Sequence, residues 1–140
     1  MAKVLVINDE TDLVDIVAIV LRAAGHEVKA CTEGLAAVDV ARGYQPTIIV
    51  LDWTLRGTDG GHVLSCLRAD EATRSIPVIM MSASQEGPSR AREAGADAFL
   101  PKPFVADKLI ELVTAVLMGS PEISASPSQT DNRSSLQNRG

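Results

Sequence analysis

The sequence predicts an α/β fold in which five parallel strands form one sheet with helices on both faces. Three continuous aliphatic runs, at residues 4–7, 47–51 and 76–81, are typical of strands buried on both faces. Between the runs lie segments in which apolar residues recur every three or four positions, as in amphipathic helices. This alternation favours a parallel sheet whose strands are joined by right-handed helical crossovers.

Each predicted strand is a short apolar run bounded by polar residues. The five strands, in order, are residues 4–7, 27–30, 47–51, 76–81 and 98–100. Four helices follow from apolar positions at helical spacing. These positions are Leu13, Ile16, Val17, Val20, Leu21 and Ala24; Leu35, Val38 and Ala41; Val63, Leu64 and Leu67; and Val105, Leu109, Leu112, Val113 and Val116. Gly25 and Gly43 predict the ends of the first two helices.

The remaining helix, fourth of five in chain order, has a weaker pattern. Pro88 suits the first helical position, so we expect the helix to begin there and to run for less than two turns before Gly95. Only Ala91 and Ala94 could face a core.

Composition narrows the class of protein. The chain has 140 residues, of which 46% are hydrophobic, and a formal net charge of −5, which favours one domain with a sizeable core over a disordered chain. It has no basic cluster suited to nucleic acid and no apolar stretch long enough for a membrane span or an export signal. We expect a cytoplasmic protein in which Cys31 and Cys66 are reduced.

The composition changes near residue 118. Residues 119–140 contain six serines, two prolines and three apolar residues, which are too few to offset the entropy of ordering. We therefore expect a domain at residues 1–118 and a flexible tail at 119–140.

Polar side chains follow four of the five predicted strands. Ligands bind open α/β sheets at the carboxyl ends of the strands, so these residues form the candidate site. They are Asn8, Asp9 and Glu10; Asp52, Trp53 and Thr54; Ser82; and Lys102. Two carboxylates close together need a counter-ion, and Mg²⁺ is the natural one for oxygen ligands. With a lysine and a hydroxyl, they suit phosphoryl transfer onto a carboxylate. The alternative is structural: Asp9 could cap a helix and Lys102 could be surface.

Four segments carry a resemblance to a known family. Residues 4–10 (VLVINDE), 51–60 (LDWTLRGTDG), 77–83 (PVIMMSA) and 94–104 (AGADAFLPKPF) resemble the signatures of CheY-like receiver domains of bacterial two-component response regulators. The resemblance covers residues 3–118. It implies the flavodoxin-like strand order 2-1-3-4-5.

The resemblance also implies roles for single residues. Asp52 would accept a phosphoryl group from a histidine kinase. Asp9, Asp52 and the backbone carbonyl of Thr54 would bind Mg²⁺ (or Mn²⁺), with Asn8 a weak or water-mediated contributor. Asn8 stands where the family usually has a second acid, so we expect weaker Mg²⁺ binding rather than none.

The other implied roles concern the phosphoryl group and the response to it. Lys102 and Ser82 would contact the phosphoryl group, and Ser82 and Phe99 would form the conformational switch. The Lys102–Pro103 peptide would be cis.

Two further departures affect the expected surface. Leu55 and Arg56 replace the usual Met-Pro, and Arg56 either faces solvent or reaches the phosphoryl group or a partner. The segment from Ser82 to Lys102 is about two residues shorter than is common in the family, which puts a dimer through the fourth helix in doubt. We expect a monomer or weak dimer.

The leading hypothesis is a single-domain response regulator in a phosphorelay. Its partners would be a sensor histidine kinase or phosphotransfer protein and a downstream protein effector, without direct contact to nucleic acid or membrane. It would catalyse only its own phosphorylation and dephosphorylation. The alternative is a degenerate receiver that binds partners without phosphorylation. A phosphatase is disfavoured because Thr54 stands where such enzymes carry a second Asp, and a flavin protein because no phosphate loop follows the first strand.

Overall fold

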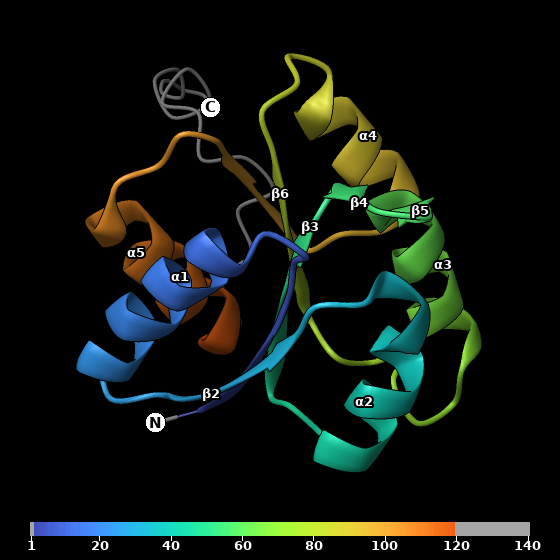
Figure 1. Ribbon diagram of the computed structural model, residues 1–140, viewed down its shortest axis with the longest axis horizontal. Helices are drawn as coiled ribbons and strands as arrows, with labels where there is room; N and C mark the ends of the chain where they lie inside the picture. The colour runs from blue at the N-terminus through green and yellow to red at the C-terminus, as the bar shows by residue number, and fades with distance from the viewer. Residues whose placement is uncertain (1, 120–140) are drawn as a thin grey trace, which may run out of the picture.

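The computed structural model of the protein describes residues 2–119 (Figure 1), so the expected tail lies, apart from Gly119, outside the described residues. Five parallel strands form one sheet in the order β2-β1-β3-β6-β7. They are β1 (Lys3–Ile7), β2 (Glu27–Cys31), β3 (Ile48–Asp52), β6 (Val78–Ser82) and β7 (Ala98–Pro101). The expected order 2-1-3-4-5 is confirmed. The fourth and fifth strands of this sheet are labelled β6 and β7, because the labels β4 and β5 belong to a short hairpin.

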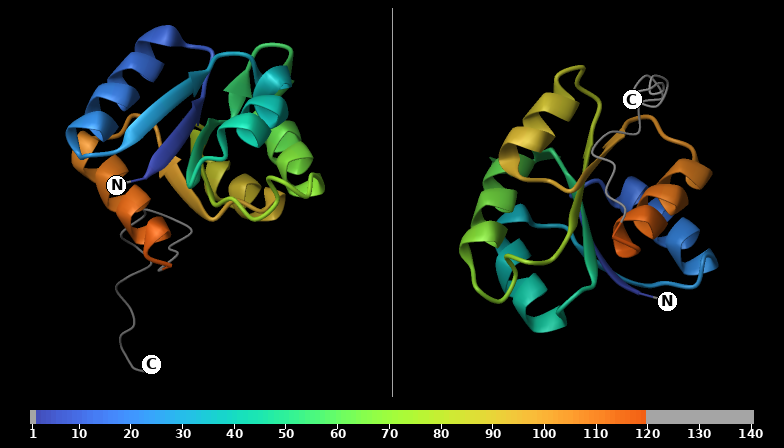
Figure 2. Two further views of the ribbon diagram at one scale, coloured as in Figure 1. Left: turned by 90° about the horizontal axis from the view of Figure 1, so that it is seen from below. Right: turned by 180° about the vertical axis from the view of Figure 1, so that it is seen from behind.

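The helices cover the two faces of the sheet unequally. On one face lie α1 (Thr11–Ala23) and α5 (Ala106–Leu117). On the other lie α2 (Ala37–Tyr44), α3 (Gly60–Ala69) and α4 (Gly87–Ala94), as the views from below and behind show (Figure 2). A short 3₁₀ turn, η1 (Gly34–Ala36), precedes α2. No helix of residues 2–119 is long and apolar enough to cross a membrane.

Two hydrophobic cores explain the continuous aliphatic runs. Successive side chains of a strand point to opposite faces, so Leu5 and Ile7 of β1 pack under α2, α3 and α4, whereas Val4 and Val6 pack under α1 and α5. β3 and β6 alternate in the same way, and each is buried at all five positions. Burial on both faces requires apolar residues at consecutive positions.

A two-stranded hairpin interrupts the expected pattern after β3. Its strands, β4 (Thr54–Leu55) and β5 (Thr58–Asp59), are antiparallel and are joined through Gly57 at φ +75°. The hairpin leads into α3, whose N-cap is Asp59: its side chain accepts a hydrogen bond from the backbone N–H of His62 at 2.8 Å. The hairpin was not expected from the sequence.

The expected helical faces were partly wrong. Ile16, Leu35 and Val105 were assigned to the core, but they are 54%, 76% and 67% exposed. Leu35 lies in η1 and Val105 is the N-cap of α5, so neither follows the α-helical periodicity that suggested burial. The buried face of α1 is instead formed by Val14, Val17, Ala18 and Leu21.

Two helix boundaries also differ from expectation. The second helix does not stop at Gly43 but ends at Tyr44, with Gln45 in the left-handed region at φ 51°. The fourth begins at Gly87, and its eight residues make slightly more than two turns, so the expected length was short. Ala91 is buried and Ala94 partly so, as expected, and the helix ends at Gly95 at φ +95°.

Core and surface leucines should respond differently to truncation. Leu67 is fully buried, so Leu67→Ala is expected to lower the free energy of unfolding by about 2–5 kcal/mol, because it leaves a cavity. Leu35→Ala, at an exposed position, should change it by less than about 0.5 kcal/mol. Urea unfolding followed by Trp53 fluorescence compares them. Equal losses would place Leu35 in the core and contradict the structure.

Candidate functional site

Asp52 is the buried centre of the candidate site. It is the last residue of β3, and only 1% of it is exposed. Its Oδ2 accepts hydrogen bonds from Lys102 Nζ and from Asn8 Nδ2, both at 2.8 Å, and its Oδ1 accepts one from the backbone N–H of Thr54 at 2.9 Å. The carboxylate is therefore held by three donors, one of them a cation.

The register of the sheet brings these donors together. Ile7 of β1 lies opposite Leu51 of β3, so the next residues, Asn8 and Asp52, are neighbours at the carboxyl edge. On the other side, Lys102 follows β7, and its backbone N–H donates to the carbonyl of Ser82 at 2.9 Å. Three strand ends thus bring Asn8 and Lys102 into contact with Asp52.

Asn8 is buried and uses both ends of its amide. Its Oδ1 accepts a hydrogen bond from the backbone N–H of Glu10 at 2.8 Å, at the start of α1, while its Nδ2 donates to Asp52. These partners fix the orientation of the amide, since a backbone N–H needs an acceptor and a carboxylate needs a donor. The sequence did not predict this arrangement, in which the amide oxygen faces the helix.

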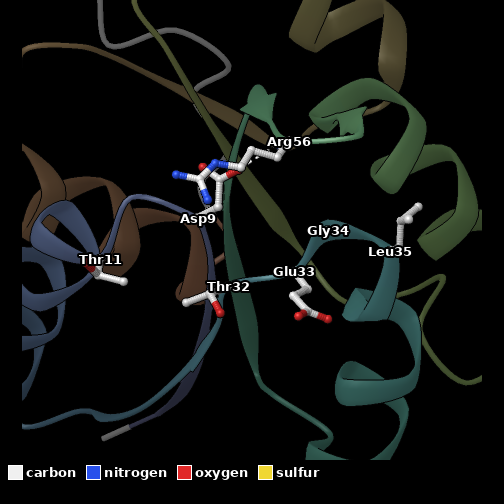
Figure 3. A pocket seen from close by; sticks show the side chains of 7 residues that line it. All are labelled: Asp9, Thr11, Thr32, Glu33, Gly34, Leu35 and Arg56. Atoms are coloured by element: carbon white, nitrogen blue, oxygen red, sulfur yellow. Dashed lines mark hydrogen bonds between the residues drawn. The ribbon is translucent and has the colours of Figure 1, made fainter.

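Asp9 lies at the open side of the site. Its Oδ2 accepts a hydrogen bond from the backbone N–H of Arg56 at 2.6 Å, so the β4–β5 turn is tied to the end of β1 (Figure 3). Asp9 therefore does not act as a helix cap through its side chain. It borders a pocket of about 460 Å³, which Figure 3 shows between the start of α1 and η1. The pocket residues are Asp9, Thr11, Thr32, Glu33, Gly34, Leu35 and Arg56.

A second cleft lies closer to Asp52. It has a volume of about 380 Å³, and Asp9, Thr54, Arg56 and Lys102 are among its lining residues. Within residues 2–119, no group of three or more His, Cys, Asp or Glu side chains is placed to hold a metal ion. Two carboxylates with backbone carbonyls and water are nevertheless a donor set that fits Mg²⁺, which keeps several of its waters in proteins.

Ser82 and Phe99 are both buried on the α4 side of the site. Ser82 ends β6, and its Oγ accepts a hydrogen bond from the backbone N–H of Ser84 at 3.0 Å. Phe99 of β7 is 2% exposed, so its ring points into the core. A Cβ added to Gly87 would lie 2.5 Å from Phe99 Cζ and 3.3 Å from Ser82 Cβ, so α4 begins against both residues. The Lys102–Pro103 peptide is cis.

Trp53 points away from the carboxylates. Its ring is half-buried beside Gly61 of α3, and the Arg90 guanidinium of α4 lies over it at 5.8 Å from the ring centroid. The Trp53 side chain therefore contacts α3 and α4.

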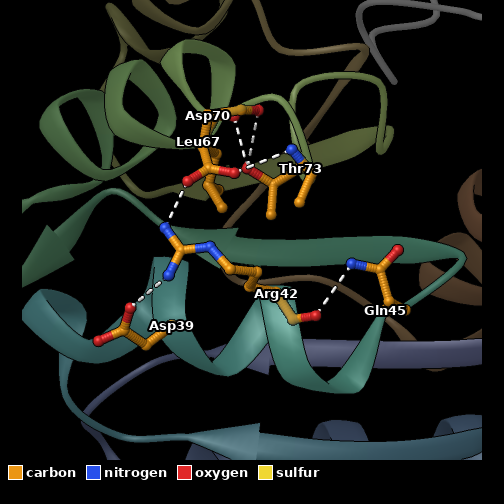
Figure 4. Close-up of polar contacts among 7 residues, drawn as sticks. Asp39, Arg42, Gln45, Leu67, Asp70 and Thr73 are labelled. Carbon is orange, nitrogen blue, oxygen red and sulfur yellow. Dashed lines mark hydrogen bonds and ion pairs between the residues drawn. The ribbon is translucent and has the colours of Figure 1, made fainter.

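The other ionisable clusters lie away from the site. Arg42 of α2 pairs with Asp39 and Asp70 (Figure 4), and its hydrogen bond holds the pKa of Asp70 below its usual value. Burial lowers the pKa of His26, whose Nδ1 accepts a hydrogen bond from the backbone N–H of Ala2 at 3.2 Å. Burial raises the pKa of the Cys31 thiol. These contacts connect structural elements and leave the strand-end cluster as the candidate site.

Comparison with known proteins identifies the family. The response regulator receiver domain model matches residues 4–114. The chain belongs to this family. The receiver domain matches the DNA-binding dual master transcriptional regulator RpaA of Synechocystis at 33% identity, over 100% of this chain and 57% of the relative. It matches the phosphate regulon transcriptional regulatory protein PhoB of Pseudomonas aeruginosa at 34% identity, over 81% of this chain and 51% of the relative. The chain thus spans about half the length of these curated relatives.

Solved structures show the same fold. The Francisella response regulator 1452 receiver domain superposes with a TM-score of 0.78 at 28% identity, over 86% of this chain and 99% of that one. The chemotaxis protein CheY4 of Vibrio cholerae superposes with a TM-score of 0.77 at 26% identity, over 83% and 98%. The receiver fold expected from the sequence is confirmed.

The contact between α4 and Phe99 is open to a direct test. Gly87→Ala is expected to lower the free energy of unfolding by about 1–3 kcal/mol, because the new Cβ overlaps the ring of Phe99. In a Phe99→Ala background the same change should cost much less, since the ring is gone. Chemical denaturation of the four proteins gives the coupling.

Gly43→Ala is the matched control for this test. Gly43 lies in α2 with nothing within 4 Å of an added Cβ, so the change should stabilise the protein by about 0.5–1 kcal/mol. An equal cost of Gly87→Ala with and without Phe99 would show that the ring is not the obstacle.

Proposed function

We propose that this receiver domain accepts a phosphoryl group on Asp52 from a histidine kinase or phosphotransfer protein, in a Mg²⁺-dependent reaction. Receiver domains are phosphoacceptor signalling domains of two-component systems and are not generally classed as enzymes. The observation that carries the proposal is the Asp52 carboxylate, held by Lys102 at the carboxyl edge of the sheet beside the cleft that Asp9 lines.

The proposed reaction is a transfer between a donor and this carboxylate. An oxygen of Asp52 attacks the phosphorus, the bond from phosphorus to the donor breaks, and the leaving group departs with the electron pair, which leaves an acyl phosphate. The Lys102 ammonium, already 2.8 Å from Oδ2, would pair with the added phosphoryl oxygens. Bound Mg²⁺ would supply charge that offsets the negative oxygens. Asp9, Asp52 and the Thr54 carbonyl would hold it.

The proposed response involves Ser82 and Phe99. In the structure, the Ser82 hydroxyl accepts a hydrogen bond from the Ser84 backbone N–H, and the Phe99 ring is buried. If the hydroxyl moves to the phosphoryl group, the space beside Phe99 and the start of α4 changes, because Gly87 contacts both residues. The α4 surface would then differ between the two states.

We further propose that this domain signals to a protein effector, as a monomer or weak dimer, without itself contacting nucleic acid or membrane. DNA binding belongs to the relative RpaA by its name, and this chain covers 57% of that protein. The net charge of −5 disfavours direct contact with nucleic acid, and the short α4 disfavours a strong dimer through that helix. The free cysteines, Cys31 and Cys66, fit a reducing compartment such as the cytoplasm.

One observation favours the alternative, a receiver that binds partners without being phosphorylated. Asn8 gives Asp52 a neutral hydrogen-bond donor where the family usually has a second acid, so the carboxylate is satisfied without a metal. The two tests below separate these possibilities.

The acceptor can be tested by mass spectrometry. With acetyl phosphate and Mg²⁺, the protein is expected to gain the mass of one phosphoryl group at Asp52, because the carboxylate is the nucleophile. Asp52→Asn should gain none, and removal of Mg²⁺ by EDTA should abolish the gain. An unlabelled wild type beside a labelled control receiver would favour the alternative.

The metal site can be tested at Asn8. Asn8→Asp is expected to bind Mg²⁺ at least about fivefold more tightly, because a second buried carboxylate 2.8 Å from Asp52 needs a counter-ion. Without Mg²⁺ the same variant should be less stable than the wild type, since two buried like charges repel.

Asn8→Ala is the matched control, because it removes the amide without adding a charge. Calorimetric titration with Mg²⁺ gives the three dissociation constants. An unchanged constant in Asn8→Asp would refute the idea that Asn8 weakens the metal site.

A further inference from the structure

We infer that Arg56 is a second cationic contact for the phosphoryl group of the donor, opposite Lys102. The inference rests on the proposed function and names one residue beyond it. Four observations carry it: the anchoring of the β4–β5 turn, the position of the guanidinium, its lack of an ionic partner in the described part of the chain, and the charge balance of the site.

The backbone of Arg56 is fixed at the site. Its N–H donates to Asp9 Oδ2 at 2.6 Å. On one side Leu55 is buried, and its Cδ1 would lie 3.0 Å from a Cβ at Gly34. On the other side Gly57 adopts φ +75°, which closes the turn in a conformation that glycine favours. The side chain of Arg56 therefore starts from a held position rather than from a loose loop.

The side chain of Arg56 extends over the acidic edge. In Figure 3 it runs from the turn toward Asp9. It lines the pocket at η1, a second pocket along the start of α1, and the cleft that it shares with Thr54 and Lys102. Asp9 is the other residue common to all three. A ligand that approaches Asp52 through the shared cleft would meet Arg56 and Lys102 together.

Arg56 is the cation at this cleft that is not already in an ion pair within residues 2–119. Lys102 is paired with the buried Asp52, whereas the guanidinium of Arg56 makes no ion pair with any residue in the range 2–119. Asn8 is neutral. The site therefore has one carboxylate fewer to attract the Arg56 guanidinium than it would have with an acid at position 8. A phosphoryl dianion that enters the cleft therefore meets a positive charge that is not neutralised by an ion pair within residues 2–119.

The chemistry of guanidinium suits the phosphoryl group. Its planar fork donates two parallel hydrogen bonds to phosphate oxygens, and it carries a full positive charge at neutral pH. Bound in this way, the donor would be held by its transferable part, so the contact would serve small phosphodonors and a protein phosphohistidine alike.

The test compares wild type, Arg56→Ala, Arg56→Lys and the control Arg74→Ala. Arg56→Ala keeps the backbone N–H that binds Asp9, so it removes only the side chain. Arg74 is an exposed arginine between α3 and β6, and it lies outside the three clefts. Phosphorylation rates are measured against donor concentration with acetyl phosphate and with phosphoramidate, whose phosphorus is bonded to nitrogen as in phosphohistidine.

We expect Arg56→Ala to reduce the second-order rate constant about fivefold to tenfold with both donors, the order of one charge-assisted contact at an exposed site. Arg56→Lys should lie between, because it keeps the charge and loses the fork. The rate of the wild type should fall more steeply with salt than that of Arg56→Ala. Arg74→Ala should match the wild type.

A binding arm without chemistry accompanies the rates. Inorganic phosphate is titrated in the presence of Mg²⁺ and followed by the NMR signal of the Arg56 side-chain Nε–H. The signal should shift in the wild type, and backbone amides at the site should report weaker binding in Arg56→Ala.

Each other outcome overturns the inference. Equal rates and equal phosphate affinities in wild type and Arg56→Ala would place the guanidinium in solvent. A faster Arg56→Ala would make it an obstacle. A loss with one donor alone would assign the contact to the leaving group. If the wild type is not phosphorylated, the proposed function fails, and the phosphate titration still decides the role of Arg56.

Discussion

A carboxylate removed from water must receive hydrogen bonds, since an ion buried without partners destabilises the fold by several kcal/mol. Asp52 is 1% exposed and receives three, from Asn8, from Lys102 and from the backbone of Thr54. Asn8 follows β1 and Lys102 follows β7, whereas Thr54 lies two residues after Asp52 in the same segment. The order and register of β1, β3 and β7 are therefore conditions for the site, and a slip of one residue in any strand would remove a donor.

The neutral amide of Asn8 changes the electrostatics around that carboxylate. An acid at this position would repel Asp52 and make a bound cation a requirement, whereas the amide satisfies Asp52 by itself and also holds the first turn of α1 through Glu10. Lys102 then balances the single buried charge. Asp9 remains at the open edge, held by the backbone of the β4–β5 turn, so the proposed metal site and the position of Arg56 depend on the same hydrogen bond.

A steric contact connects the site to the α4 side of the molecule. The first residue of α4 is Gly87, and the missing Cβ leaves the space that the Phe99 ring occupies, next to Ser82. Trp53, which directly follows Asp52, touches α3 at Gly61 and lies under Arg90 of α4. The end of β3, the Phe99 ring and the short helix α4 are thus packed so closely that a change in one requires adjustment of the others.

The sequence by itself determined the five strands of the main sheet, the approximate positions of the five helices and the polar residues that follow the strands. Apolar runs that alternate with amphipathic helices are typical of a parallel sheet, whose strands end at one edge. The structure brings Asn8 and Lys102 into contact with Asp52 at that edge. The strand order was available only through the family resemblance. Tertiary structure alone decided that Ile16 and Leu35 face solvent, that the oxygen of Asn8 faces α1, and that the turn of Arg56 reaches Asp9. The reason is that these features depend on contacts between segments far apart in the chain, which local periodicity does not encode.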